Sequence, residues 1–256
     1  MIGIYDINDR SDLPAAARFE IYKNAGFSEV AFYIDNAYMA NNETYEQLFK
    51  TAKEFGLAVN QVHADYKISN EICNEESNIY FDYVDKKLSE CEKHGVKYLV
   101  VHASKGDNPP IITNQQISKL AKLTDNHPNV VLCFENVRNN INLESVLNAK
   151  IANAKMCFDL GHAHAYSNEK QLYNRHASEI YCAHLHNNYG TDSHNPLWDG
   201  EIDVEYFLKK LISKSEISIC LECFPPKGDY YDKKHFVEFI KKCKESTQNK
   251  NSFIGR

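Results

Sequence analysis

The sequence alternates eight times between a short run rich in β-branched and aromatic residues and a longer run with helical spacing of its apolar residues. This alternation predicts a parallel sheet with helical crossovers, because parallel strands need connections long enough to hold a helix. Residues 98–101 (Tyr-Leu-Val-Val) are apolar throughout, as expected for a strand covered on both faces. The expected strands span residues 2–6, 29–34, 57–63, 97–102, 130–135, 155–159, 180–186 and 217–222.

The helical runs lie between these strands, and Gly26, Gly56 and Gly95 follow three of them, as is typical of helix C-termini. Eight strand–helix units in 256 residues match a (β/α)8 TIM barrel, which belongs to the α/β class. No linker-like segment divides the chain, so we expect a single barrel domain over residues 1–245 and a polar tail over 246–256. The expected helices span residues 14–24, 43–55, 77–94, 114–126, 143–149, 169–176, 204–213 and 233–244.

Composition narrows the class of protein. Hydrophobic residues make up 43% and charged residues 25%, which excludes collagen-like, coiled-coil and wholly disordered chains. The 29 basic and 35 acidic residues give a net charge of −6, which disfavours a nucleic-acid partner but leaves a local basic cleft open. No apolar run reaches the roughly 18–20 residues of a membrane span. The first residues lack a secretory pattern and the eight cysteines are scattered, so we expect a cytoplasmic protein with reduced thiols.

Ionisable side chains lie at the C-terminal ends of six expected strands. In a (β/α)8 barrel these ends converge on the face that carries active sites. Two further pairs lie close by: His162 is three residues beyond Asp159, and Asp192 is two residues before His194. Carboxylates with imidazoles suit Mn²⁺, Mg²⁺, Zn²⁺ or Fe²⁺ better than a thiolate site does. The six strand-end residues are His63, His102, Glu135, Asp159, His184 and Glu222.

Four cysteines share a register with these residues: Cys133, Cys157, Cys182 and Cys220 each lie two residues before one of them. A period of two places the cysteines on the same inward face, one level deeper in the barrel. We expect them to fill the interior as small apolar side chains rather than to bind a second metal. Because barrel layers draw on alternate strands, Cys133 and Cys182 are expected in one layer and Cys157 and Cys220 in another.

These features resemble the xylose isomerase-like barrels, a superfamily that includes sugar-phosphate isomerases and epimerases and abasic-site nucleases of the endonuclease IV type. The resemblance covers nearly the whole chain and depends on the order and spacing of several motifs. The motifs are Val62-His-Ala-Asp-Tyr66, Val100-Val-His-Ala103, Cys133-Phe-Glu-Asn136, Phe158-Asp-Leu-Gly-His-Ala163, His184-Leu-His-Asn187, Asp192-Ser-His-Asn-Pro-Leu197 and Cys220-Leu-Glu222.

The resemblance implies two overlapping sets of metal ligands, for one to three divalent ions per chain. Isomerases and epimerases of this group hold one metal, and endonuclease-like members hold three. The single-metal set corresponds to Glu135, Asp159, His184 and Glu222. The trinuclear set adds His63 and His102 beside Glu135, and a third site from His162, Asp192 and His194. Every position is matched here, so the ligand set alone does not distinguish the two activities.

Two positions depart from the isomerase-like pattern. Asn187 stands where the pattern has an aspartate, and an amide cannot act as a base or as an anionic ligand. Trp198 stands where a glycine is expected. It could form an apolar wall over the mouth of the barrel or anchor the loop by packing.

We favour a divalent-metal-dependent isomerase or epimerase that acts on a sugar or sugar phosphate. In this hypothesis Glu135 and Glu222 are the catalytic acid and base, which transfer a proton by way of an enediolate stabilised by the metal. His162 and His186 would bind substrate hydroxyls, and Lys105 would meet a phosphate.

The alternative is a phosphoester hydrolase of the endonuclease IV type, with a trinuclear site and a basic surface for DNA. The expected mouth loops carry as many acidic as basic residues, which gives little electrostatic footprint for DNA. A metal-free scaffold barrel is a third hypothesis, and the presence of all four single-metal ligands argues against it. Whether the chain is a monomer or a homo-oligomer stays open. The charged loop residues are Lys67, Lys105, Arg138 and Lys227, and Asp65, Asp107, Asp199 and Asp229.

Overall fold

The computed structural model of the chain describes residues 2–7, 12–38, 42–76, 78–225 and 232–248. These residues form a single barrel of eight strands in the order β2-β1-β8-β7-β6-β5-β4-β3, with every neighbouring pair parallel. The predicted single-domain (β/α)8 TIM barrel is therefore confirmed. The strands are β1 (Ile2–Tyr5), β2 (Val30–Ala31), β3 (Gln61–His63), β4 (Tyr98–His102), β5 (Val131–Glu135), β6 (Ala154–Asp159), β7 (Ile180–Leu185) and β8 (Ser218–Leu221).

The barrel closes between β2 and β3 through backbone hydrogen bonds beyond the two short strands. The amide of Val30 donates to the carbonyl of Ala58 at 2.9 Å, and the amide of Ile34 donates to the carbonyl of His63 at 2.8 Å. The amide of His63 in turn donates to the carbonyl of Phe32 at 3.0 Å. These bonds hold His63 at the same end of the barrel as the other strand-end residues.

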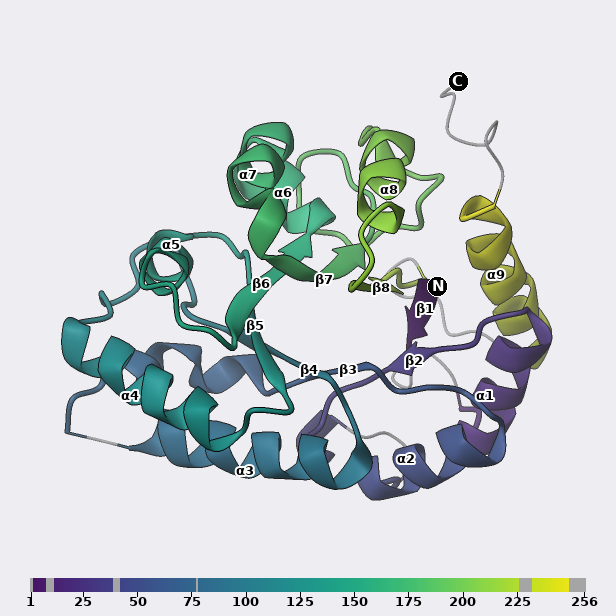
Figure 1. Cartoon of the computed structure of the whole chain (residues 1–256). Helices are drawn as coiled ribbons and strands as arrows, with labels where there is room; N and C mark the ends of the chain where they lie inside the picture. The colour runs from purple at the N-terminus through teal and green to yellow at the C-terminus, as the bar shows by residue number, and fades with distance from the viewer. Residues whose placement is uncertain (1, 8–11, 39–41, 77, 226–231, 249–256) are drawn as a thin grey trace.

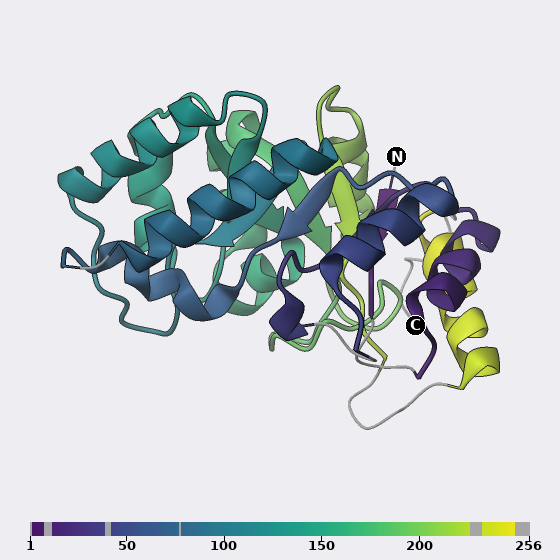
Figure 2. The ribbon, with the colours of Figure 1, turned by 90° about the horizontal axis from the view of Figure 1, so that it is seen from below.

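Helices surround the ring of strands. Figure 1 looks down the barrel, and Figure 2 shows the same ribbon turned by 90°. Two short elements at the site end had not been predicted: α6, which begins at Leu160 directly after β6, and η3, which begins at Tyr66 shortly after β3. The helices are α1 (Ala15–Asn24), η2 (Asn36–Tyr38), α2 (Tyr45–Glu54), η3 (Tyr66–Cys73), α3 (Ile79–His94), α4 (Asn114–Asn126), α5 (Ile141–Asn148), α6 (Leu160–Tyr166), α7 (Glu169–His176), η4 (Ala177–Glu179), α8 (Val204–Ile212) and α9 (Lys233–Ser246).

Local sequence signals explain several helix ends. Thr44 begins α2 with a capping box: its hydroxyl accepts from the Gln47 amide at 3.3 Å, and Gln47 Oε1 accepts from the Thr44 amide at 2.7 Å. A cap of this kind contributes about 1 kcal/mol. Gly95 ends α3 at φ 71°, a left-handed conformation that favours glycine.

A buried ion pair joins β1 to α1. Arg18 is fully buried, and its Nε and Nη2 atoms lie 2.9 and 2.8 Å from the two carboxylate oxygens of Asp6. Arg18 Nη2 also donates to Glu43 Oε2 at 2.9 Å, which ties the segment before α2 to the same guanidinium. The hydroxyl of Tyr22 donates to Asp6 Oδ1 at 2.9 Å. Asp6 therefore has a partner for each oxygen, as a buried carboxylate requires.

The cysteines inside the barrel are buried among apolar side chains, as predicted, and all eight cysteines of the chain are free thiols. The predicted pairing in layers was wrong. Cys133, Cys157 and Cys182 share one cluster, while Cys220 packs with Tyr5 and Ala31. The reason is a register shift: Met156 pairs with Ile180 but Cys157 pairs with Cys182, so Tyr181 is passed over.

In the part of the chain that the structure describes, no helix is long and apolar enough to cross a membrane. The helix α9 ends at Ser246, and residues 249–256 of the predicted tail lie outside the described residues, so the boundary at 245 stays a prediction. Three other residues that bear on the predictions also lie outside the described residues. Ser77, Lys227 and Asp229 are not among the described residues.

Candidate active site and metal centre

The structure places the six strand-end side chains together at the C-terminal mouth of the barrel. Four of them form a buried cluster in which one ligand atom of each lies within 4.8 Å of the others. His184 lies at its centre, with Nδ1 3.0 Å from Glu222 Oε2, 3.4 Å from Glu135 Oε1 and 3.9 Å from Asp159 Oδ2. This first cluster is the set expected to hold a single metal: Glu135, Asp159, His184 and Glu222.

A second cluster shares Glu135 with the first. Glu135 Oε2 lies 2.9 Å from His63 Nε2 and 3.0 Å from His102 Nε2, while its Oε1 faces His184. Glu135 and His63 are buried, and the side chain of His102 is 15% exposed at the open side. A carboxylate placed between two groups of imidazoles has the geometry of a bridging ligand.

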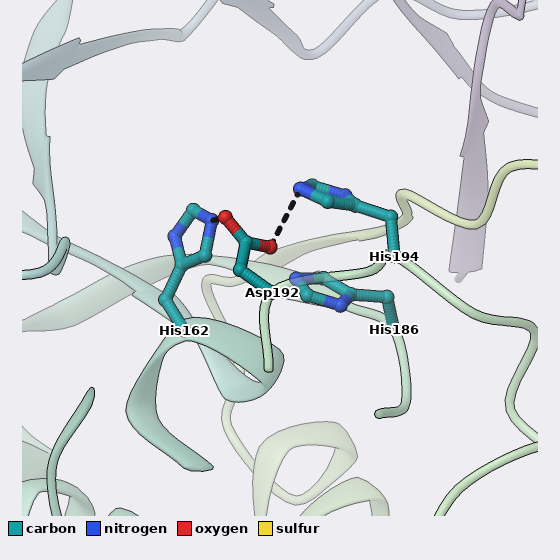
Figure 3. Close-up of side chains that lie close together, drawn as sticks. All are labelled: His162, His186, Asp192 and His194. Atoms are coloured by element: carbon teal, nitrogen blue, oxygen red, sulfur yellow. Dashed lines mark ion pairs between the residues drawn. The ribbon is translucent and has the colours of Figure 1, made fainter. Parts of the chain in front are cut away.

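The third cluster lies on α6, which follows β6, and on the loop that follows β7 (Figure 3). Asp192 stands between two histidines, with Oδ2 3.4 Å from His162 Nε2 and Oδ1 3.2 Å from His194 Nε2. His186 joins them, and its ring stacks on that of His194 at 3.9 Å with 12° between the planes. The structure therefore brings together the three residues expected at a third site and adds His186 to them. That any of the nine residues binds a metal stays a prediction.

The residues expected to bind substrate differ in exposure. His186 is fully buried, with Nε2 3.0 Å from Asp159 Oδ1, so it lies between the first and third clusters rather than on the open surface. His162 is also buried and contacts Glu135, with Nδ1 3.1 Å from Oε1. Lys105 is exposed in the loop after β4, and its Nζ lies 5.5 Å from the ring centre of Tyr66 at the mouth.

The backbone around α6 positions the carboxylate and the imidazole that the sequence places three residues apart. Asp159 caps α6 by accepting from the His162 amide at 2.6 Å. Asn136, directly after β5, accepts from the Asp159 amide and donates to the Asp159 carbonyl, both at 2.8 Å. The carbonyl of Asn136 also contacts His162 Nδ1 at 3.1 Å. Asn136 thus positions two site residues, a role that was not predicted from the sequence.

A loop conformation places His194 in the third cluster. Its φ of 49° lies in the left-handed region, which is uncommon for a residue other than glycine. His194 Nδ1 lies 3.0 Å from the Glu222 carbonyl, and its ring stacks on Phe224 at 4.9 Å. Such backbone strain, held by surrounding contacts, is found most often at functional sites.

In the first cluster without a metal, electrostatics favour ionised glutamates beside a protonated His184. Burial raises the pKa of Glu222, but His184 opposes this and brings that pKa to about 2. Burial likewise raises the pKa of Glu135, while His184 and His102 lower it well below its ordinary value. Burial lowers the pKa of His184, but the negative charge of Cys157 in its thiolate form and the carboxylates of Glu222 and Glu135 raise it well above the ordinary value.

The cluster fits the divalent metal implied by the resemblance. Among the described residues of the mouth, three buried side chains carry polar atoms that make no well-aligned hydrogen bond: Asp159 Oδ2, His184 Nδ1 and both ring nitrogens of His186. His184 Nδ1 and His186 Nε2 have only the close carboxylate contacts given above. Orphaned buried groups of this kind are rare and costly. The first cluster offers three carboxylates and one imidazole, a donor set that suits Mn²⁺, Mg²⁺, Zn²⁺ or Fe²⁺.

The two departures from the isomerase-like pattern have structural explanations. Asn187 Nδ2 donates to the Leu197 carbonyl at 2.9 Å, and its Oδ1 accepts from the amides of Asn188 and Ile202. An aspartate could not make the first of these bonds. Trp198 anchors its loop, because its ring packs edge-on against Phe239 of α9 at 6.0 Å.

Comparisons with known proteins agree with this architecture. The model of the family described as "Xylose isomerase-like TIM barrel" matches residues 19–243. Among curated proteins, none matches the chain. Solved structures with a similar fold include 3-keto-D-glucoside 4-epimerase from E. coli, with 17% identity and a TM-score of 0.71 over 96% of this chain and 98% of that one.

Two further structures are similar over most of both chains. D-psicose 3-epimerase from Clostridium cellulolyticum H10, solved with D-tagatose, is 12% identical with a TM-score of 0.72, over 96% of this chain and 98% of that one. A xylose isomerase-like TIM barrel protein from Mycobacterium smegmatis, in complex with magnesium, is 13% identical with a TM-score of 0.63, over 93% and 91%. At these identities the likeness shows the fold.

Proposed function

The chain belongs to the xylose isomerase-like TIM barrel family, and on that premise we propose that it is a divalent-metal-dependent sugar isomerase or epimerase. The observation that carries the proposal is the first cluster: ligand atoms of Glu135 and Glu222 lie within 4.8 Å of each other, beside Asp159 and His184. Sugar epimerases among proteins of similar fold support this choice of reaction. A small carbohydrate is the proposed substrate.

In the proposed reaction one glutamate removes the proton from the carbon beside the carbonyl, and the other returns a proton. A bound divalent ion would act as a Lewis acid toward the carbonyl and hydroxyl oxygens of the substrate. Both glutamates are buried and their pKa values lie below the ordinary value, so each is ionised at the start and can serve as the base. The glutamate that acts as the acid first takes up a proton from water and passes that proton to the carbon, while the base keeps the proton that it removed. Proton transfer by a positioned group typically contributes about 10²–10⁴-fold to the rate.

Other residues of the mouth would position the sugar. We propose that His162 and His186 bind substrate hydroxyls and that Lys105 meets a phosphate if the substrate carries one. The exposed ammonium of Lys105 over Tyr66 supports the last role, since it lies on the rim rather than in the buried cluster. The ring of Tyr66 lies 6.2 Å from that of His102, which connects this rim to the second cluster.

The experiment that tests the proposal combines elemental analysis with activity. Protein purified without a chelator is analysed for Mn, Mg, Zn and Fe, and is then assayed on a panel of ketoses, aldoses and their phosphates. We expect at least one divalent ion per chain and turnover of a sugar that a chelator abolishes. Metal-bound protein that converts no sugar on the panel, or active protein free of metal, would contradict the proposal.

A second candidate function is phosphoester hydrolysis of the endonuclease IV type, and the complete third cluster favours it. The charges of the rim argue against a DNA substrate, because the Arg138 guanidinium is already paired with Asp107. An oligonucleotide with one abasic site therefore belongs in the same assay. Three metal ions per chain together with strand cleavage would replace the sugar reaction by this one.

A further inference from the structure

We propose that Gln61 is a positioning residue that orients His184 and leaves its Nδ1 atom bare toward the first cluster. Gln61 Oε1 lies 3.0 Å from His184 Nε2, and Gln61 Nε2 donates to the hydroxyl of Ser218 at 3.0 Å. All three side chains are buried, with 3%, 1% and 4% of their surface exposed for Gln61, His184 and Ser218.

The three residues come from separate strands of the barrel. Gln61 lies in β3, two residues before His63, so it points inward one level below the metal cluster. His184 lies in β7 and Ser218 begins β8. Because β3 and β8 are separated in the ring by β1 and β2, the amide of Gln61 reaches across the interior to contact Ser218 and His184.

The chemistry of imidazole makes this contact decisive. A neutral histidine has one N–H and one lone pair, so a nitrogen that binds a metal requires the proton on the other nitrogen. His184 Nδ1 faces the carboxylates of Glu222 and Glu135, and Nε2 faces Gln61. With Nε2 protonated, Gln61 Oε1 accepts the hydrogen bond and Nδ1 keeps its lone pair for a cation.

Other histidines of the site follow the same pattern with a different kind of acceptor. In each, one ring nitrogen contacts a backbone carbonyl and the other faces a carboxylate of a cluster. The carbonyls belong to Ala64 for His63 at 2.6 Å, to Asn136 for His162 at 3.1 Å and to Glu222 for His194 at 3.0 Å. Among these four histidines, His184 contacts a side-chain oxygen, that of Gln61, where the other three contact a backbone carbonyl. Substitution of Gln61 therefore removes the acceptor that orients His184.

Ser218 holds the far end of the Gln61 amide. Its hydroxyl accepts from the amide nitrogen, while the amide oxygen points at His184. The inference rests on the proposed function only in assuming that the first cluster binds a divalent ion. The orientation of His184 itself can be measured in the metal-free protein.

The test measures Mn²⁺ affinity by calorimetry and the His184 tautomer by long-range ¹⁵N–¹H correlation spectra of metal-free protein labelled at histidine. The spectra are recorded at a pH above the raised pKa of His184, where its imidazole is neutral. Gln61→Leu keeps the volume but removes the acceptor, and Gln61→Glu keeps the acceptor. Gln116→Leu is the matched control, because Gln116 is another buried glutamine, 1% exposed, that bonds to Thr113 away from the site. Unfolding of each metal-free variant in urea reports general damage to the fold.

We expect wild-type His184 to carry its hydrogen on Nε2, and Gln61→Leu to lose this preference and to bind Mn²⁺ about 10–100-fold more weakly. Gln61→Glu and Gln116→Leu should bind Mn²⁺ as the wild type does. Gln61→Leu that binds Mn²⁺ as tightly as the wild type, or wild-type His184 with its hydrogen on Nδ1, would overturn the inference.

Two outcomes need separate treatment. If Gln61→Leu does not fold, Ser218→Ala takes its place. Weaker Mn²⁺ binding by Ser218→Ala, with unchanged binding by Gln61→Glu, supports the role of Gln61. Unchanged binding by Ser218→Ala, with weaker binding by Gln61→Glu, overturns it. If the wild type binds no divalent ion, the proposed function fails, and the tautomer in metal-free protein still decides whether Gln61 orients His184.

Discussion

Gly161 lies directly against the imidazole of His186, so closely that a Cβ atom at position 161 would be 1.9 Å from Cε1 of the ring. Gly161 is the second residue of α6, and its own carbonyl accepts from Asn188 Nδ2 at 2.9 Å. This hydrogen bond ties the backbone at position 161 to the loop after β7. A glycine at 161 is what allows His186 to lie between the first and third clusters.

The substitution Gly161→Ala tests this contact. Because the added methyl group overlaps the ring, His186 must move, and we expect overpacking to cost about 1–3 kcal/mol of unfolding free energy. Urea denaturation of the metal-free protein measures the loss. In the His186→Ala background the same change should cost much less, because the ring that it meets is gone. Equal costs in both backgrounds would contradict the contact.

The catalytic roles of the two glutamates are tested by Glu135→Gln and Glu222→Gln. Each removes a proton acceptor while preserving shape, so we expect kcat on the active sugar to fall by about 10²–10⁴-fold. Metal content is measured beside kcat, because both residues are also expected ligands. Asp199→Asn, at an exposed pair with Tyr189, is the control and should keep wild-type activity. Near-normal kcat in a metal-loaded glutamate variant would remove that residue from catalysis.

The stability of the metal-free protein should fall on both sides of a plateau in pH. Glu222, whose folded pKa is about 2, contributes stability that is present above the ordinary value of about 4.3 and is lost as the pH falls through about 2. His184, whose folded pKa is raised, contributes stability that is present below about 6.5 and is lost as the pH rises through the raised value.

Thermal unfolding from pH 3 to pH 9 measures this profile, and Mn²⁺ added at the alkaline end should restore the lost stability because a cation replaces the protons. A second histidine needs a control. Burial lowers the pKa of His127, but Glu92 and Asp85 raise it above the ordinary value, so His127→Gln separates its contribution from that of the site. Unfolding that does not change between pH 6 and pH 9 would contradict the account.

The buried pair between Arg18 and Asp6 should be a large contributor to stability when broken from one side. Arg18→Met leaves Asp6 charged and buried, which costs about 3–5 kcal/mol of unfolding free energy. Lys50→Met, in the exposed pair with Glu54 at 3.8 Å, is the matched control and should cost less than about 1 kcal/mol. Similar losses of unfolding free energy in the two variants would show that the buried Arg18–Asp6 pair contributes no more to stability than the exposed pair does.

Much of the fold could be predicted because each local signal repeats around the barrel. Residues at the ends of strands, such as Glu135 and His184, could be placed on one face because parallel strands end together. The period of two likewise placed Cys133 inside the barrel. The grouping of the cysteines could not be predicted, because it depends on the register shift at Cys157, which leaves no local sequence signal.

The missing parts of the site are those that depend on contacts between distant segments. His186 could be assigned to the active face from its strand, but its stacking on His194 depends on the path of the loop after β7. Gln61 carried a usable signal, since it is a polar residue two positions before His63 in a strand expected to be buried. Its partner Ser218 is 157 residues away, so only the closed barrel reveals the contact.

The measurement that most directly tests the central claim is deuterium incorporation from D₂O into a sugar at the carbon beside its carbonyl, followed by NMR with the Mn²⁺-loaded protein. We predict exchange of that hydrogen in at least one ketose or ketose phosphate, and its loss in Glu135→Gln, in Glu222→Gln and after chelation. The result that would contradict the sugar reaction is a protein that binds Mn²⁺ and cleaves an abasic-site oligonucleotide but exchanges hydrogen in no sugar of the panel.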